Sequence, residues 1–306
     1  MTLTPRLFLL LSLPPLLWAG NAVLGRMLVG LVPPMTLNLL RWVFAVAILL
    51  PLAWRALRPW SRIRERWGYL FAIGVLGAGT YNSLQYLALV SSTPINVTLV
   101  ASSLPVWSLV VGMAFFGERP ARQQLLGAAL GMGAVVLVLS RGSWDLLLGV
   151  RFVPGDLCMV LAVIGWSFYS WLLARPPAHM RGERRPDWNW AGFLLIQALF
   201  GLIGSGVFSA TEQALGTHPV AWSLPVLAAL LYTALGASIL AYRCWGLGVA
   251  EGGPMLASLF NNLTPPMAAL LSGALLGEAP KAYHGLAFLL LLAGIWVSSR
   301  RTTAPS

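Results

Sequence analysis

Two stretches of the chain match each other at a distance of 160 residues, and they decide the fold. Residues 94–120 are PINVTLVASSLPVWSLVVGMAFFGERP, and residues 254–280 are PMLASLFNNLTPPMAALLSGALLGEAP. Pro105 pairs with Pro265, and both stretches end in Gly-Glu, one further residue and a proline. Matches of this kind at one fixed spacing indicate a duplication rather than two unrelated segments.

The composition limits the class of protein. Of 306 residues, 58% are hydrophobic and 9% are charged, and the mean hydropathy is +0.77. Soluble domains average about 25% charged residues. This chain has too few charges for a water-facing surface, which excludes a soluble enzyme, a disordered chain and a disulfide scaffold. The composition predicts a membrane protein with many spans.

Apolar runs between clusters of Pro, Gly and Arg predict ten membrane-spanning helices, since one span needs about 20 residues. They are expected at residues 7–29, 36–54, 67–90, 94–116, 123–140, 156–174, 190–210, 222–248, 254–276 and 283–299. The first run follows Arg6 as a signal peptide would. It lacks a clean small-residue cleavage site, so we expect a spanning helix there.

The basic residues orient these spans. Nineteen of the twenty are arginine, and fourteen fall at the termini or in loops on one side of the predicted bilayer. Three fall on the other side, and Arg26, Arg41 and Arg243 lie inside predicted spans. This asymmetry follows the positive-inside rule and predicts that both termini are cytoplasmic. It also explains the net charge of +11 without nucleic-acid binding.

The duplication predicts two halves, residues 1–145 and 146–306. Five helices in each half is an odd number, so the second half must enter the membrane from the opposite side. The predicted fold class is therefore an all-α integral membrane protein, with ten transmembrane helices in two inverted five-helix repeats. Many secondary transporters have this architecture, with a substrate site near the bilayer midplane. The alternative is a duplicated bundle without a transport role.

Polar and aromatic side chains in the middle of spans are the candidates for a substrate site, because polar groups in hydrocarbon are costly unless they face a cavity or a partner. Ser238 of the eighth predicted span is a further polar residue of this kind. Hydrogen bonds between neighbouring helices are the alternative explanation for the Ser and Asn residues. The predicted substrate-binding residues are Trp18, Asn21, Tyr81, Asn82, Asn96, Ser103, Trp107, Trp166, Tyr169, Asn261 and Asn262.

Three residues are candidates for a gate or a hinge. Pro105 and Pro265 each remove a helical hydrogen bond, so they should bend the fourth and ninth helices at matching depths. Arg41 lies within about a turn or so of the end of its helix and could meet a substrate carboxylate there, as could Arg26. The alternative for both arginines is that the side chain reaches the lipid headgroups.

Several short motifs resemble those of a known family. They are Trp18-Ala-Gly-Asn21, Val32-Pro33-Pro34, Leu40-Arg41-Trp42, Gly117-Glu118-Arg119-Pro120 and Gly277-Glu278-Ala279-Pro280. In this order they resemble the EamA-type branch of the drug/metabolite transporter superfamily, over about residues 7–299. The resemblance implies ten helices in two inverted halves and export of small metabolites. It is strongest to bacterial amino-acid exporters, including exporters of aromatic amino acids, and it implies the bacterial inner membrane.

We therefore predict a secondary transporter that exports amino acids by alternating access at a cavity between the repeats. The alternative is a carrier of the same fold for drugs or for nucleotide- or lipid-linked metabolites. None of the nine acidic residues lies mid-span, which favours facilitated export over a carboxylate proton relay. We expect no P-loop, enzyme activity, cofactor, metal site or nucleic-acid partner. The expected partners are a small-molecule substrate and the lipid bilayer, with the protein acting as a monomer.

Overall fold

The computed structural model describes residues 3–92, 94–140, 145, 148–149, 151, 153–276 and 282–299. Within these ranges the regular structure is entirely helical. The helices that position the site are α1 (Pro5–Met27), α2 (Pro34–Ala53), α3 (Trp60–Arg64), α4 (Trp67–Ile73), η2 (Gly74–Thr80), α5 (Tyr81–Ser91), α6 (Pro94–Ala101), α7 (Leu104–Phe116), α8 (Arg122–Leu139), α10 (Pro154–Ala174), α11 (Trp190–Ala214), α12 (Leu224–Tyr232), η5 (Thr233–Leu240), α13 (Ala241–Asn261), α14 (Thr264–Leu276) and α15 (Ala282–Ser299).

Each apolar run of the sequence is helical in the structure. Five described helical segments are, by themselves, long and apolar enough to cross a membrane: Pro5–Gly25, Pro34–Leu57, Pro154–Ala174, Trp190–Ala214 and Leu224–Asn261. Other predicted spans are divided. The run at 67–90 comprises α4, η2 and α5, and the run at 94–116 comprises α6 and α7.

The two matching stretches both break rather than bend. The first divides between α6 and α7, and the second divides between the end of α13 and α14. Pro105 and Pro265 are each the second residue of the later helix. A proline fits the first turn of a helix, where its missing N–H leaves no hydrogen bond unmade. The sequence predicted a bend at these positions, and the structure has a new helix start.

The backbone hydrogen bonds at the two breaks correspond at the repeat spacing. Ser103 N donates to Val100 O over 3.0 Å, and Leu263 N donates to Phe260 O over 2.9 Å. Both are three-residue closures that tighten the last turn before the break. Trp107 N then donates to Ser103 O over 3.1 Å, and Met267 N donates to Leu263 O over 3.0 Å. The duplicated sequence therefore adopts the same local geometry twice.

A second pair of matching segments is π-helical. The segments η2 and η5 contain Leu76-Gly77-Ala78 and Leu235-Gly236-Ala237, which also resemble each other in sequence. In a π-helix the hydrogen bonds span five residues instead of four, and such turns are concentrated at functional sites. The sequence did not predict these turns.

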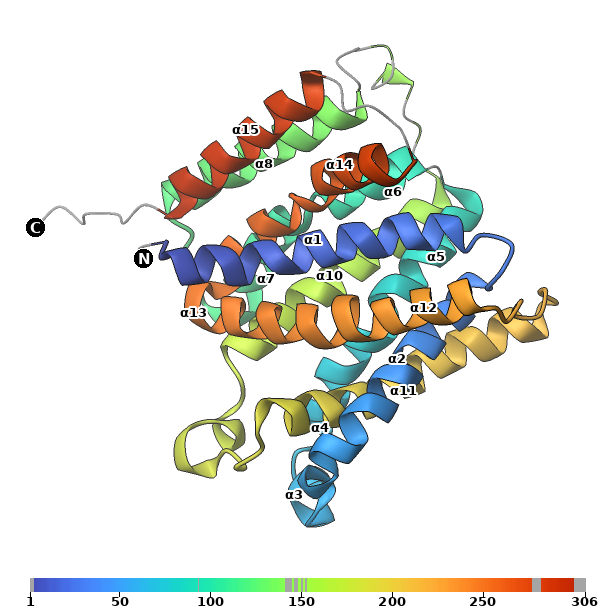
Figure 1. The fold of residues 1–306 in the computed structure, drawn as a ribbon. Coiled ribbons are helices and arrows are strands. Elements are labelled where there is room, and N and C mark those ends of the chain that lie inside the picture. The colour runs from blue at the N-terminus through green and yellow to red at the C-terminus, as the bar shows by residue number, and fades with distance from the viewer. Residues whose placement is uncertain are drawn as a thin grey trace, which may run out of the picture.

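Glycines let the helices next to the site approach at backbone distance. A Cβ added to Gly74 would lie 2.7 Å from Gln197 O, and one added to Gly79 would lie 3.0 Å from Gly201 O. A Cβ on Gly127 of α8 would lie 2.7 Å from Gly294 O of α15, and these two helices lie side by side (Figure 1). Small residues at such contacts are typical of helix packing in membranes.

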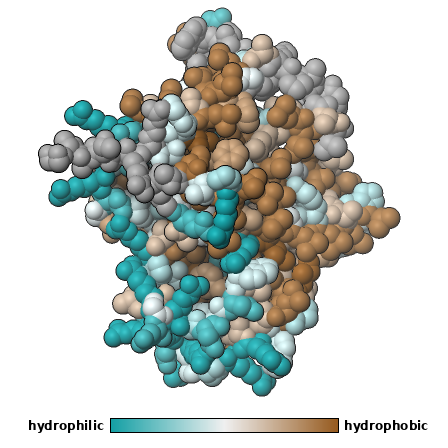
Figure 2. All heavy atoms as spheres, turned by 60° about the vertical axis from the view of Figure 1, so that its left-hand side comes forward, coloured by the Kyte–Doolittle hydropathy of each residue, from teal (hydrophilic) through white to brown (hydrophobic). Residues whose placement is uncertain are grey.

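The arginine-rich loops gather at one side of the molecule. The N-terminus and the loop after α10 lie on the left of Figure 1 and α3 lies at the bottom, while the later ends of α1 and α11 lie on the right. Arg66 links two of these loops, because its Nε and Nη2 donate to His179 O and Arg184 O. Arg62 pairs with Asp187 in the same region. Figure 2 shows hydrophilic side chains concentrated on one side of the molecule and apolar side chains over much of the rest.

Candidate functional site

Aromatic side chains from five helices meet in the interior. The indole ring of Trp166 is central, with its centroid 5.3 Å from that of Trp18 and 5.5 Å from that of Trp245. Tyr242 lies 5.6 Å from Trp166. Most of the ring pairs are edge-to-face or tilted, which are favourable geometries for aromatic contacts. We call the following residues the aromatic cluster: Trp18, Trp42, Tyr81, Trp166, Tyr169, Tyr242 and Trp245.

The two π-helices hold the cluster in place through their carbonyl groups. Trp18 Nε1 donates to Ala237 O of η5 over 3.0 Å, and Tyr242 Oη donates to Gly77 O of η2 over 2.7 Å. Both acceptors belong to the Leu-Gly-Ala matches. Trp245 Nε1 also donates to Ser170 Oγ over 3.2 Å. These bonds satisfy the polar ends of large apolar rings, as buried Trp and Tyr require.

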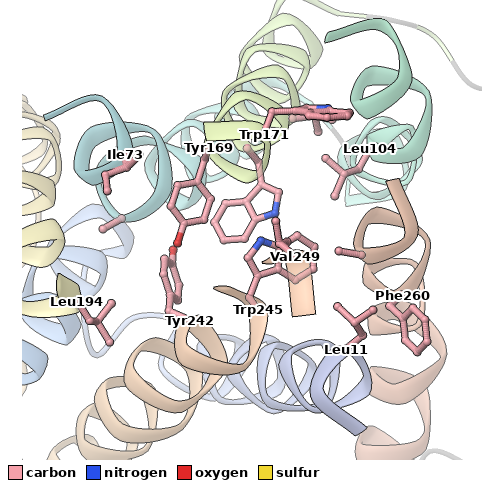
Figure 3. Packing of buried hydrophobic residues seen from close by; sticks show 14 of the residues in the cluster. Leu11, Ile73, Leu104, Tyr169, Trp171, Leu194, Tyr242, Trp245, Val249 and Phe260 are labelled. Carbon is pink, nitrogen blue, oxygen red and sulfur yellow. The ribbon is translucent and has the colours of Figure 1, made fainter. Parts of the chain in front are cut away.

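A cavity of about 190 Å³ reaches the cluster from the arginine-rich side. Its inner wall includes Tyr169 and Tyr242, which extend toward one another from α10 and α13 (Figure 3). Gln197 lies beside them and donates from Nε2 to Tyr169 Oη over 3.0 Å. Arg185 and Arg243 also line the cavity. The cavity therefore joins a basic surface to an aromatic interior.

Arg41 is buried next to the cluster. Its side chain lies on α2, the residue is 2% exposed, and its guanidinium carbon is 5.5 Å from the ring centroid of Trp42. Arg41 Nε donates to Ser238 Oγ over 3.0 Å, and Ser238 Oγ donates in turn to Thr233 O. An arginine that reached the headgroups would be exposed. That alternative is therefore wrong for Arg41.

The polar residues at the helix breaks form a second group. Asn262 Nδ2 donates to Ser102 O over 3.2 Å, which joins the two breaks directly. Ser103 Oγ instead donates to Val100 O in its own chain segment. Asn261 is partly buried, and Trp107 packs against the hydrophobic core. These residues lie at the breaks and are not members of the aromatic cluster.

The predicted residues therefore divide into groups. Trp18, Tyr81, Trp166 and Tyr169 meet in the aromatic cluster, and of the predicted set Tyr169 also lines the cavity. Asn82 bonds to Asn38 over 3.5 Å. Asn21 is partly buried on α1. The side chains of Asn96 and Arg26 lie outside the described part of the structure. A substrate-binding role for each residue remains a prediction.

Sequence reasoning missed three members of the cluster, which are Trp42, Tyr242 and Trp245. The predicted set rested mainly on polar groups in the middle of spans. Tyr242 and Trp245 are three residues apart, and this spacing puts both on the same face of a helix. That pattern, on the helix that also carries Ser238, was the available signal.

Comparison with known proteins places this architecture in a family. The family model described as "EamA-like transporter family" matches residues 6–140 and again residues 153–300. The chain belongs to the EamA-like transporter family. This EamA-family protein is thus a membrane transporter, in agreement with its apolar helices.

Several relatives of this EamA-family transporter carry names. An uncharacterised transporter of Archaeoglobus fulgidus is 24% identical over 297 residues, which are 96% of this chain and 97% of that protein. A probable terminal-alkyne amino-acid exporter of Streptantibioticus cattleyicolor is 24% identical over 231 residues, 75% of this chain and 72% of that protein. A solved crystal structure aligns with a TM-score of 0.74, 23% identity and 95% of both chains, and therefore shares the fold.

Proposed function

We propose that this EamA-family transporter exports amino acids, neutral and aromatic ones in particular, by alternating access at the aromatic cluster. The observation that carries the proposal is the meeting of Trp18, Trp166 and Tyr242 beside a cavity that reaches the arginine-rich side. Aromatic faces bind apolar side chains and also attract an ammonium group, by about 0.5–2 kcal/mol per contact. Such weak contacts suit a carrier that must release its cargo.

The proposal includes ten spans in two inverted halves. Two local features support it, since within the described residues each half of the sequence has a π-helix and a helix break just before the matching proline. The family model also matches the chain twice. Broken helices next to a central site are a recurrent feature of transporters that work by alternating access. In this view residues 1–145 and 146–306 move relative to each other around the cluster.

We place the protein in a bacterial inner membrane with the arginine-rich side and both termini in the cytoplasm. The cavity would then be the route by which substrate enters from the cytoplasm. Transport is proposed to run down the substrate's own gradient by a monomer. The name of the Streptantibioticus cattleyicolor relative supports amino acids as the substrate class. A drug or another metabolite would be the substrate if amino acids are not moved.

The test is counterflow of labelled phenylalanine and leucine into proteoliposomes, with and without a pH gradient. Wild-type protein should exchange these amino acids, and Trp18→Ala and Trp166→Ala should lower the exchange rate at least about tenfold, as loss of more than one aromatic contact implies. Trp60→Ala is the matched control, because Trp60 is 63% exposed on α3.

Each outcome has a distinct meaning. Exchange that depends on the two tryptophans but not on the pH gradient supports facilitated export at the cluster. Exchange whose rate depends on the pH gradient would contradict the proposal that transport is not coupled to protons. If well-folded wild-type protein moves no amino acid, the substrate assignment is wrong, and the same vesicles should be tested with cationic drugs and nucleotide-linked metabolites.

A further inference from the structure

One buried charge in the interior, that of Arg41, has no counter-ion among the described residues. Arg41 is 2% exposed, and within the described residues it takes part in no ion pair. Its one hydrogen bond there runs from Nε to a neutral hydroxyl, that of Ser238. A guanidinium carries five N–H groups. The structure thus leaves the two Nη groups of a buried cation without an acceptor among the described residues.

The helix packed against α2 carries a carboxylate, but that carboxylate does not neutralise Arg41. Glu212 of α11 accepts hydrogen bonds from Met35 N over 3.0 Å and from Thr36 N over 2.8 Å. It therefore caps the start of α2, where an acidic group is favourable next to the free N–H groups. Thr36 Oγ1 donates to the same carboxylate. Glu212 and Arg41 do not form an ion pair in the described structure.

A second unused donor lies against the guanidinium. The ring of Trp42 is fully buried, and its Nε1 has no hydrogen-bond partner among the described residues. The contact between Arg41 and Trp42 therefore brings together guanidinium and indole donors without matching acceptors. Buried polar groups are almost always paired, and burying an unpaired charge costs several kcal/mol. Buried hydrogen-bond donors next to a positive charge form a favourable binding site for an anion.

The location connects this surplus of donors to the aromatic cluster. Trp42 is edge-on to Tyr242 with ring centroids 4.9 Å apart, and Tyr242 lies 5.6 Å from Trp166. The donors of Arg41 and Trp42 therefore lie at one end of a continuous row of aromatic rings, and Trp166 lies at the other end. The other described arginine in a span, Arg243, differs, because it packs on Trp190 and lines the cavity near the basic surface.

We propose that Arg41, with the indole N–H of Trp42, binds the carboxylate of the transported substrate. The proposal deepens the proposed function, on which it rests for the identity of the substrate. Arg41 Nη1 and Nη2 would donate to the two carboxylate oxygens in the bidentate manner typical of arginine. Ser238 holds Nε and so fixes the plane of the guanidinium. The substrate class is then a small monocarboxylate with an apolar or aromatic side chain.

Binding is measured first, without transport, on purified protein in detergent. The probes are phenylalanine, 3-phenylpropionate, which lacks the amine, and phenylalaninamide, which lacks the charged carboxylate. Intrinsic tryptophan fluorescence is the readout, since the cluster contains four tryptophans. The wild-type protein should bind both carboxylates at least about tenfold more tightly than the amide, because hydrogen bonds to charged groups are worth about 1.5–3 kcal/mol.

The variants are Arg41→Gln, Arg41→Lys and the control Arg55→Gln. Arg55 also packs on a tryptophan, Trp54, with 5.8 Å to the ring centroid, but it is exposed. Arg41→Gln should raise the dissociation constant of both carboxylates about 10- to 100-fold and leave that of the amide unchanged. Arg41→Lys should give an intermediate loss, because lysine keeps the charge without the bidentate geometry. Arg55→Gln should match the wild type.

Thermal unfolding separates binding from folding. Removing an unpaired buried charge is expected to leave the Tm unchanged or raise it, whereas a purely structural arginine would lower the Tm when replaced. A lower Tm with unchanged carboxylate affinity would overturn the proposal. Equal affinity of the wild-type protein for the acid and the amide, or no binding of any carboxylate, would also overturn it.

Counterflow of the same three compounds then separates the two proposals. If 3-phenylpropionate binds through Arg41 but no amino acid is exchanged, the carboxylate site stands and amino-acid export is wrong. If phenylalanine and phenylalaninamide are exchanged equally well by the wild-type protein and by Arg41→Gln, export stands and the carboxylate site is wrong.

Discussion

Asn262 donates a hydrogen bond from its side-chain amide to the backbone carbonyl of Ser102, which occupies the matching position 160 residues earlier. Both residues lie where a helix stops and a new one starts within three residues. The two breaks of the chain are therefore in direct contact. Asn262 is 1% exposed, so this contact lies inside the protein rather than at its surface.

The contact between the breaks predicts a role for Asn262 in stability. Asn262→Ala should destabilise the folded protein by about 1–3 kcal/mol, because Ser102 O would lose its partner in a buried place. Thermal unfolding in detergent measures the change. Asn261→Ala is the control, because no side-chain hydrogen bond of Asn261 occurs in the described structure. An equal loss for both variants would contradict the role of the bond.

The glycine contacts between η2 and α11 predict a sharp difference within one helix. Gly201→Leu should lower the yield of folded protein and cost at least about 2 kcal/mol. Even the first added carbon would lie 2.5 Å from Ala78 Cβ and 3.0 Å from Gly74 O. Gly206→Leu on the same helix should be tolerated, because nothing lies within 4 Å of its added Cβ. Size-exclusion profiles and Tm values compare the two variants.

The ring contacts predict that Trp166 stabilises the fold more than Trp18 does. Trp166 is 5% exposed and contacts five aromatic rings, whereas Trp18 is partly exposed and contacts three. Trp166→Ala should cost about 3–5 kcal/mol and Trp18→Ala clearly less. Trp166→Phe should recover much of the loss in Tm. A larger effect for Trp18 would show that the cluster is not centred on Trp166.

The distribution of arginines predicts the orientation in the membrane. Two single-cysteine variants test this orientation. Ser61→Cys places a thiol on the exposed part of α3, on the arginine-rich side, and His218→Cys places one in the exposed loop between α11 and α12. In a protein whose own Cys158 and Cys244 are replaced by Ala, a membrane-impermeant maleimide should label only His218→Cys in intact cells. Ser61→Cys should react after permeabilisation. The reverse pattern would place the termini outside.

Helix positions could be predicted from the sequence because arginine and proline clusters bound the apolar runs. The sequence placed runs at 36–54 and 156–174, and the structure has helices at Pro34–Ala53 and Pro154–Ala174. Trp18 and Trp166 were both predicted as site residues from their mid-span positions, and their rings are in contact. Helix positions follow from the local pattern of apolar, arginine and proline residues, which can be read from the sequence alone.

Other features depend on contacts between distant segments. The π-helical turns η2 and η5 have no sequence signature that we recognised, and their carbonyl groups bind Tyr242 and Trp18 from other helices. The sequence also placed Arg41 close to a helix end and allowed its side chain to reach headgroups. In the structure its side chain is buried and bonds to Ser238, which is 197 residues away along the chain. Such partners become visible only when the helices are packed.

The charge of Arg41, which has no counter-ion in the described part of the chain, has a consequence for ion leakage across the membrane. A fixed positive charge in a narrow path raises an electrostatic barrier to protons and metal cations, as arginines do in selective pores. In the proposed binding mode, a substrate carboxylate would neutralise the charge only while the substrate is bound. In the proposed mechanism, the side chain that binds the substrate would therefore also prevent proton leakage through the transporter. The ion gradients of the cell would then be maintained during each cycle of export.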